Sequence, residues 1–252
     1  TFRQDLYRPG DRIILDRNQR YVPRAEPADF LAGGKRVNIE RLELRTMPDG
    51  GTAASALQSG EIDYIQSPSF DLLGVLGRNR NISVGGPGGM NSYQGYFRLN
   101  HASPPFNDPE IRQVLWHLFD QSTVLTALGL PERLTQPGCL SWFMCGTPLE
   151  NTAGADRARN PSVAAAREAL RRTRYNGEKV VVLQATDIET LRVSSAVAAD
   201  LLTQAGFNVE LQAMDWGTLL NRRGRREGWA LFGVTASGFD LAQPPTHFYL
   251  SG

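Results

Sequence analysis

The sequence predicts an α/β protein with a mainly parallel sheet. Helical and apolar strand patterns alternate over residues 160–236, and the helical stretches there begin with a capping residue or end at a glycine. Strands that alternate with helices form βαβ units, in which the strands run parallel. A length of 252 residues is enough for one large domain or two small ones.

Over residues 160–236, a helix followed by a strand is predicted three times. The first helix covers residues 160–177, with Asn160 as its cap and Asn176-Gly177 as its stop. A second helix ends at Gly206, and a short basic helix begins after Asp215. The strands of this half are apolar or alternating, and they cover 178–185, 207–214 and 229–236.

The first part of the chain gives shorter signals. An apolar run at 13–15 predicts a strand. Residues 22–37 are polar and contain Pro and Gly, so we expect a loop there. Within 37–47, Leu42 and Leu44 alternate with charged residues, which is typical of a half-buried strand.

Three further features follow before residue 100. An Ala-rich segment at 51–66 predicts a helix that stops near Gly60, and then a short strand at 62–65. The Gly-rich stretch 84–92 is a candidate hinge, and a strand is expected over 93–100.

The best-defined helix start lies directly after that strand. Asn107 or Asp108 can cap it, Pro109 suits the first turn, and Glu110 favours the positive end of a helix. Apolar residues at 111, 114, 115, 118 and 119 form one stripe, so this helix is expected to be buried. Residues 130–160 lack periodicity and predict a long loop.

The charge balance argues against nucleic acid or an anionic membrane as a partner. The chain has 27 basic and 26 acidic residues, a net charge of +1. No segment approaches the roughly 18 apolar residues of a membrane span, so we expect no membrane insertion. The opening "TFRQDLYRPG" has no signal-peptide pattern, and the chain is interpreted as a mature protein or an excised piece.

No enzyme active site, cofactor site or metal site is predicted. The sequence has no nucleophile elbow and no paired-acid motif, and "GGPGG" at 85–89 is not followed by the Lys-Ser/Thr of a phosphate loop. The histidines fit no ligand spacing and are interpreted as structural; they are His101, His117 and His247.

Cys139 and Cys145 leave three interpretations open. A disulfide that closes the loop between them would suit an oxidising compartment. Two buried thiols are the second interpretation. The third is a catalytic dyad with His101 or His117, assembled across the fold.

Six segments, in this order along the chain, resemble the periplasmic oligopeptide- and dipeptide-binding proteins, solute-binding protein family 5. They are "RPGDRIILDRN", "ALQSGEIDYI", "FRLNHASPPFNDPEIRQVLWHLFDQ", "GCLSWFMCGTP", "AGFNVELQAMDWGTLLNRR" and "WALFGVTASGFD". The resemblance implies a two-lobe α/β fold, type II-like, with a ligand cleft between the lobes. Members of the family are about twice this length, so the chain would hold part of lobe I and most of lobe II. On that map residues 1–90 belong to lobe I, 91–236 form lobe II, and 237–252 return toward lobe I.

The resemblance also implies residues that contact the ligand. Trp216 and Arg223 match a Trp and an Arg, seven residues apart, that line the cleft in the family. A tryptophan supplies a flat wall, and an arginine can hold a carboxylate with paired donors. The alternatives are a core aromatic for Trp216 and a solvated helix end for the arginine.

The remaining candidates lie on strands and loops. Asp240 is the acid available where the family holds a peptide's α-amino group, although the family's tight Asp-Pro pattern is absent from "ASGFDLAQPP". Asn91, Tyr93 and Tyr96 flank the first crossover and would face the cleft, or would pack in the hinge. Trp142, in the cysteine loop, would contact the ligand or anchor the loop.

We interpret the chain as part of a ligand-binding module rather than an enzyme. The resemblance implies a monomeric, periplasmic solute-binding component of an ABC importer, which delivers a di- or oligopeptide-like solute to permease subunits. One alternative is a non-peptide solute. Another is a cytoplasmic ligand-sensing domain of a transcription regulator, and a cysteine-dependent enzyme is the most distant.

Overall fold

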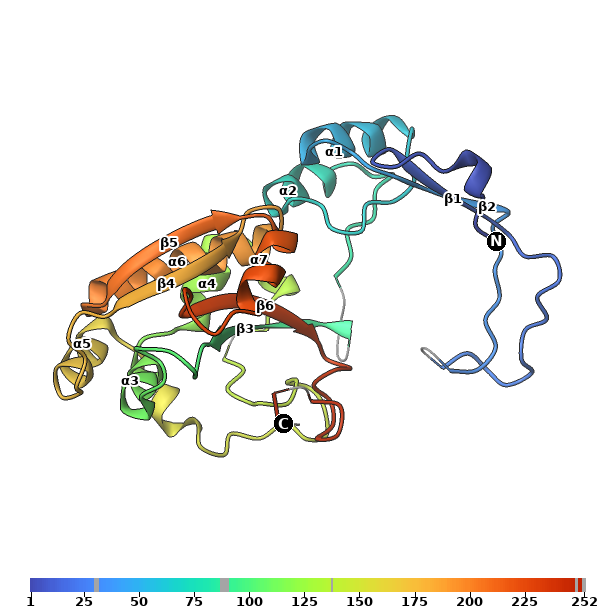
Figure 1. Cartoon of the computed structure of the whole chain (residues 1–252). Coiled ribbons are helices and arrows are strands. Elements are labelled where there is room, and N and C mark those ends of the chain that lie inside the picture. Colours follow the sequence, from blue (N-terminus) through green and yellow to red (C-terminus); the bar gives the residue numbers. More distant parts are fainter. Residues whose placement is uncertain (30–31, 87–90, 137, 248, 251–252) are drawn as a thin grey trace. The chain divides into compact units, whose positions relative to one another are not determined.

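The computed structural model describes residues 1–29, 32–86, 91–136, 138–247 and 249–250 (Figure 1). The chain divides into two compact units, Thr1–Ile82 and Ser83–Gly252. The candidate hinge at 84–92 therefore falls at the start of the second unit, and four of its residues, 87–90, lie outside the described ones. The assignment of the units to lobes stays a prediction.

The first unit contains a two-stranded antiparallel sheet and short helices. Strand β1 (Arg12–Asp16) pairs with β2 (Arg41–Arg45). Helix α1 (Gly50–Ser59) begins at Asp49, whose carboxylate accepts from the Thr52 amide, and ends at Gly60, which has a φ of 76°. The remaining helices are short, namely η1 (Gln4–Leu6), η2 (Phe70–Leu72) and α2 (Leu73–Leu76).

Two expectations for this unit are wrong. All five residues of β2 are exposed, Leu42 at 41% and Leu44 at 49%, so the strand is not half-buried. The reason is that the described part of this unit places no third strand or helix layer over that face. Residues 62–65 form no strand, and Tyr64 is 74% exposed.

The second unit is built on a four-stranded mixed sheet with the order β3-β6-β4-β5. The central strand β4 runs parallel to both β5 and β6, while β3 is antiparallel to β6. The predicted parallel arrangement therefore holds for the last three strands, and β3 forms an antiparallel edge. The strand bounds are β3 (Tyr93–Leu99), β4 (Lys179–Ala185), β5 (Asn208–Met214) and β6 (Leu231–Ser237).

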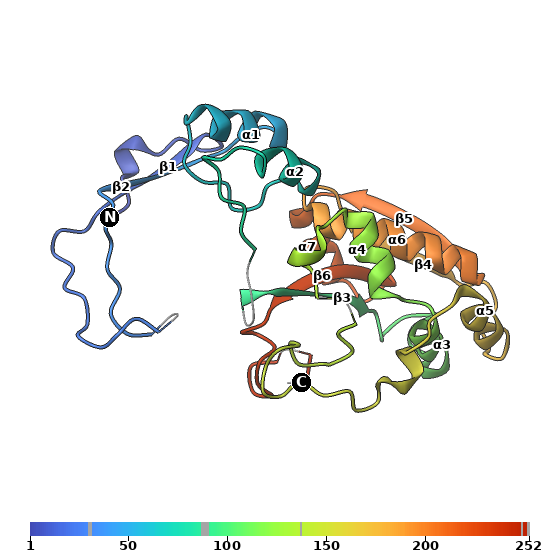
Figure 2. The same cartoon turned by 180° about the vertical axis from the view of Figure 1, so that it is seen from behind.

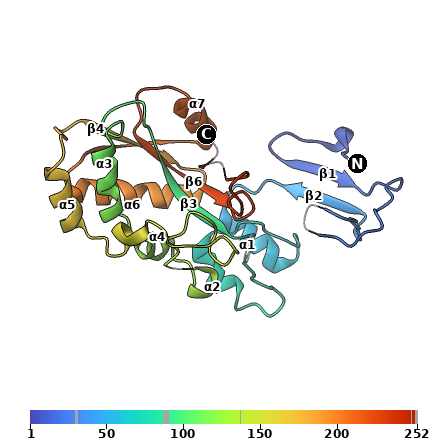
Figure 3. The same cartoon turned by 90° about the horizontal axis from the view of Figure 1, so that it is seen from below.

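Helices cover both faces of this sheet. The helical elements are α3 (Pro109–Val114), η4 (Leu115–His117), α4 (Gln121–Leu128), η5 (Glu132–Leu134), η6 (Ala155–Ala158), α5 (Val163–Arg171), α6 (Glu189–Ala205) and α7 (Trp216–Arg223). Val182 and Leu231 pack on one side with α3, α5 and α6 (Figure 2). Their neighbours Leu183 and Phe232 pack on the other side with Leu219 of α7 (Figure 3).

The structure tests the predicted starts and ends of two helices, α3 and α5. Asp108 is the cap that begins α3, because its carboxylate accepts from the Glu110 amide at 2.8 Å. The apolar stripe of this helix is buried as expected, but the α-helix ends at Val114 and one 3-10 turn continues to His117. Asn160 does not cap α5; Ser162 does, since its hydroxyl accepts from the Ala165 amide.

We expect Leu202→Ala to destabilise the second unit strongly. The Leu202 side chain is fully buried in α6, and an alanine would leave a cavity that costs about 3 kcal/mol. All four tryptophans lie in this unit, so denaturant unfolding followed by tryptophan fluorescence reports it selectively. The control Leu211→Ala removes a side chain that is 41% exposed and should cost under about 1 kcal/mol. Equal losses for the two variants would contradict this assignment of the core.

In the first unit, Asp16 should contribute stability that depends on pH. Its carboxylate lies 2.6 Å from Arg41 and 2.8 Å from Arg3, and these hydrogen bonds lower its pKa to about 2. A lowered pKa stabilises the fold above the unfolded value near 3.8 and loses that effect as pH falls toward 2.

Asp16→Asn should therefore speed amide hydrogen exchange of β1 and β2 at neutral pH, compared with the unsubstituted chain. The difference should vanish as pH approaches 2, after correction for intrinsic exchange rates. Asp63→Asn removes an exposed carboxylate outside the strand pair and serves as the control. A difference that persists unchanged at the acid end would rule out the proposed ion pairs as its source.

Candidate functional site

The second unit gathers several loops at one edge of its sheet. Strands β4, β5 and β6 are parallel and end there, at Ala185, Met214 and Ser237. Because β3 is antiparallel, it begins at the same edge, and Tyr93 lies opposite Ser237. Ligands of open α/β sheets bind outside the carboxyl ends of strands, so this carboxyl edge is the candidate site.

Asn91, Tyr93 and Trp216 all lie at this edge. Asn91 precedes β3 and is exposed, and Tyr93 is 66% exposed. Trp216 is the first residue of α7 and is half-buried against the cluster that contains Leu219. Its backbone amide donates to the Asp187 carboxylate at 2.9 Å, which fixes the start of the helix relative to the end of β4.

Arg223 lies at the other end of the same helix. It is exposed, and its guanidinium carbon is 5.8 Å from the centre of the Phe232 ring. That arrangement is a cation–π contact with a residue of β6. Trp216 and Arg223 thus line the side of the sheet that α7 covers, although only the tryptophan is at the carboxyl edge itself.

Asp240 is held within its own turn. Its carboxylate accepts from the Ser237 hydroxyl at 2.7 Å and from the Ser237 amide at 3.3 Å. These bonds close the turn that follows β6. The residue is exposed, but its acceptor capacity is partly used within the chain.

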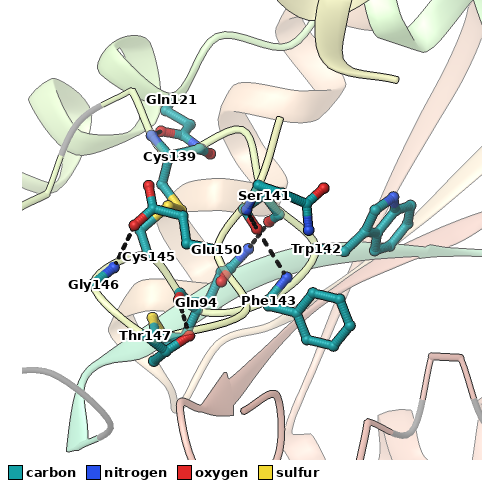
Figure 4. The surroundings of a disulfide bond; sticks show 12 residues. Gln94, Gln121, Cys139, Ser141, Trp142, Phe143, Cys145, Gly146, Thr147 and Glu150 are labelled. Carbon is teal, nitrogen blue, oxygen red and sulfur yellow. Dashed lines mark hydrogen bonds between the residues drawn. A yellow bond between two sulfur atoms is a disulfide. The ribbon is translucent and has the colours of Figure 1, made fainter. Parts of the chain in front are cut away.

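The cysteine loop lies beside β3, and its two cysteines are joined (Figure 4). The disulfide interpretation of Cys139 and Cys145 is confirmed, with α-carbons 5.9 Å apart. Gly138 and Gly146 next to them have positive φ values of 76° and 82°, as turns around a short bridge require. The Gln121 side-chain amide bonds both backbone groups of Cys139 and ties the loop to α4.

Hydrogen bonds fix the arc between the cysteines. The buried Ser141 accepts from the amides of Phe143 and Asn151, and its carbonyl accepts from the Gln94 side chain at 3.1 Å. The Trp142 indole points away from the disulfide and is 46% exposed (Figure 4). The loop therefore presents this aromatic ring from a fixed backbone.

Tyr96 connects the cysteine loop to the chain's last residues. Its hydroxyl donates to the Trp142 carbonyl at 3.5 Å, and its ring packs on Tyr249 with centroids 4.6 Å apart. Burial raises the pKa of Tyr96 well above its usual range, so the phenol stays protonated and acts as a donor. These contacts give Tyr96 a structural role, and its contact with a ligand stays a prediction.

Sequence reasoning missed the part played by His247. This histidine is fully buried, and its Nε2 lies 2.8 Å from the Trp142 carbonyl, while the Tyr249 amide donates to Nδ1 at 3.4 Å. The contact with Trp142 joins residues 105 positions apart, and the contact with Tyr249 depends on the turn between them. No local sequence pattern therefore marks either contact. Its interpretation as a structural histidine fits these contacts.

Neither a metal centre nor a membrane span is found in the residues that the structure describes. No group of three or more His, Cys, Asp or Glu side chains is placed to hold an ion. None of the described helices has the length and apolarity needed to cross a bilayer.

Comparison with known proteins identifies the family. Residues 1–252 match the family model described as bacterial extracellular solute-binding proteins, family 5 middle region. The chain belongs to this family. A curated relative, the "Probable peptide ABC transporter periplasmic-binding protein y4tO" of Sinorhizobium fredii, is 36% identical over 242 residues, covering 92% of this chain and 45% of the relative.

Solved structures show the same fold. One is DppA from Helicobacter pylori in complex with the peptide STSA, with a TM-score of 0.72 and 21% sequence identity. The match covers 99% of this family 5 chain and 44% of the DppA chain. AgaA from A. tumefaciens R10, in complex with agropinic acid, matches 94% of this chain and 44% of its own, with TM-score 0.68 and 17% identity. The α/β periplasmic binding protein fold is thereby confirmed. The family 5 chain spans a little under half the length of these proteins.

We expect the disulfide to act mainly on its own loop. Closing so short a loop removes little entropy from the unfolded chain, so Cys139→Ala with Cys145→Ala should cost about 2 kcal/mol. Hydrogen exchange at residues 140–144 should rise much more than exchange in β4. Reductant added to the original chain should reproduce both effects, and unchanged exchange in the arc would contradict the role of the disulfide in holding it.

Proposed function

We propose that the full-length protein is the solute-binding component of an ABC importer and that its solute is a di- or oligopeptide. The 36% identity to y4tO over 242 residues carries this proposal, since that relative's name describes a peptide ABC transporter binding protein. The likeness to DppA, whose structure contains the peptide STSA, agrees with it at the level of fold.

The mechanism that we propose is closure of two lobes around the solute. On the proposed map residues 1–90 are part of lobe I, 91–236 form lobe II, and 237–252 return toward lobe I; the division into two units after Ile82 supports a boundary close to residue 90. Solute contacts with both lobes shift an open–closed equilibrium, and permease subunits recognise the closed monomer. Tyr93, Trp142 and Trp216 supply aromatic surface on lobe II.

The proposed compartment is the periplasm. The Cys139–Cys145 disulfide supports it, because stable disulfides form in oxidising compartments. The same observation weighs against a cytoplasmic sensor domain. A catalytic cysteine is also disfavoured, since neither thiol is free in this structure.

A non-peptide solute is the second candidate, and Asp240 is the observation that favours it. Its Oδ2 accepts both bonds from Ser237, so this oxygen is already engaged within the turn and is less available to a peptide's α-amino group. AgaA shows that a protein of this fold can hold agropinic acid.

Calorimetry with a panel of short peptides tests the proposal. The full-length protein should bind at least one peptide with a micromolar or lower dissociation constant. The 252-residue chain should bind the same peptide weakly or undetectably, because fewer contacts are available on part of the fold.

Each alternative result has a definite meaning. Micromolar binding by the 252-residue chain would show that the other parts of the full-length protein are not needed for peptide binding. Binding of a co-purified small molecule by the full-length protein, with no peptide binding, would replace the peptide by the second candidate.

A further inference from the structure

A small core joins the cysteine loop to the residues that follow β6. Met144 of the loop packs with Ala236, near the end of β6, and with Leu241 of the turn beyond it, and all three are buried. The rings of Tyr96 and Tyr249 pack against this core. The loop and the segment after β6 therefore form one packed body within the second unit.

The backbone places His247 in a turn of that segment. Its amide donates to the Gln243 carbonyl at 3.0 Å, and its carbonyl accepts from the Leu250 amide at 2.9 Å. The residue has no exposed surface. Its ring meets the Phe143 ring edge-on, with centroids 5.5 Å apart. The imidazole is thus held beside the residue that follows Trp142.

The hydrogen-bond partners identify the tautomer of this imidazole. The Trp142 carbonyl, 2.8 Å from Nε2, can only accept, and the Tyr249 amide, 3.4 Å from Nδ1, can only donate. The proton therefore lies on Nε2, and one neutral tautomer satisfies both contacts. His247 is a donor to the cysteine loop.

Two side chains from distant segments donate to the same carbonyl of Trp142. His247 does so from the segment after β6, and the Tyr96 hydroxyl does so from β3 at 3.5 Å. The neighbouring backbone groups are also held, because the Ser141 hydroxyl accepts from the Phe143 amide at 3.2 Å and the Ser141 carbonyl accepts from a side chain of β3. The backbone is therefore fixed on both sides of the tryptophan.

The Trp142 ring is not buried by these contacts. The residue is 46% exposed, whereas His247 is fully buried. Packing of the indole into a core therefore does not explain why its backbone is held at so many points. An exposed side chain that is ordered in advance loses less conformational entropy when a ligand binds to it. The arrangement is suited to contact with a ligand.

We propose that His247 is a positioning residue for solute binding, which holds the cysteine loop so that Trp142 meets the solute in one orientation. The inference rests on the proposed function, in which Trp142 supplies aromatic surface to the solute. His247 acts through the loop, because its side chain is fully buried. The expected consequence is a preference for solutes with a flat or apolar side chain, which an indole ring contacts well.

Calorimetry with the full-length protein tests the effect on binding, with Ala-Phe-Ala and Ala-Ala-Ala as probes. Trp142→Ala should weaken binding of Ala-Phe-Ala about tenfold, through loss of an aromatic contact, and binding of Ala-Ala-Ala by less than about threefold. His247→Leu should weaken binding of Ala-Phe-Ala about fivefold, because only a fraction of the molecules then holds the ring in place. His247→Gln keeps a donor for the carbonyl and should stay within about twofold of the unsubstituted protein.

A double variant separates positioning from general destabilisation. In the Trp142→Ala background, His247→Leu should change the affinity for Ala-Phe-Ala by less than about twofold, because the ring that it positions is gone. His101→Leu is the matched control, since His101 is exposed and follows the end of β3, and it should leave the affinity unchanged. Equal weakening by His247→Leu with and without the Trp142 ring would overturn the inference, while peptide binding itself would stand.

Fluorine NMR of the full-length protein labelled with 5-fluorotryptophan tests the positioning without any solute. The Trp142 resonance, assigned with Trp142→Phe, should be single in the unsubstituted protein, broadened or divided in His247→Leu, and single again in His247→Gln. Trp216 and Trp229 belong to another cluster of the same unit, and their unchanged resonances would show that the sheet still folds.

This measurement also decides the inference if no peptide binds. In that case the proposed peptide function fails, and a Trp142 resonance that changes in His247→Leu alone would still support the positioning role of His247. An unchanged Trp142 resonance in His247→Leu would overturn it, whether or not a peptide binds.

Discussion

The antiparallel pairing of β3 with β6 is the constraint on which the second unit depends. It joins Tyr93–Leu99 to Leu231–Ser237, at opposite ends of this unit's sequence. Buried Asn100 secures the junction, since its side-chain amide donates to the carbonyls of Arg226 and Trp229 at 2.9 and 3.0 Å. Loss of these bonds would leave buried polar groups unpaired, which costs more than the bonds themselves contribute.

Much of the candidate site follows from that pairing. Because β3 runs against β6, its first residues lie where the parallel strands end. This brings Asn91 and Tyr93 to the edge at which Trp216 begins α7. The same pairing puts Gln94 within reach of Ser141 and Tyr96 within reach of Trp142, so the cysteine loop is bound along the strand. A shift by one residue would turn these side chains to the core face.

The sequence predicted those parts of the fold whose signals are local. Asp215 and Gly206 are examples: a cap and a stop are recognised within a few residues, and α7 and α6 begin and end there. The expected burial of β2 failed because burial depends on what covers a strand, which the strand's own alternation does not show. Ser162 replaced Asn160 as a cap because two capping residues two positions apart compete, and only the backbone decides between them.

The site was predictable only in part, for the same reason. Trp216 and the cysteine pair are tied to local motifs, and the structure puts the tryptophan at a strand end and joins the cysteines. His247 and Arg98 carry no such motif. His247 matters because it meets the Trp142 carbonyl 105 positions away, and Arg98 lies opposite Phe232, a neighbour that only the β3–β6 pairing reveals.

The net charge of the whole chain, +1, does not describe how acidic and basic side chains are placed in the second unit. Acidic side chains near the carboxyl edge of the sheet accept from backbone amides, where a carboxylate stabilises a turn or a helix start. Arginines cannot fill those acceptor positions, because a guanidinium only donates. Arg223 instead lies over the Phe232 ring, with its guanidinium carbon 5.8 Å from the ring centre. The chain's net charge near zero therefore excludes a strong long-range field, but it does not describe how single charges are placed in this unit.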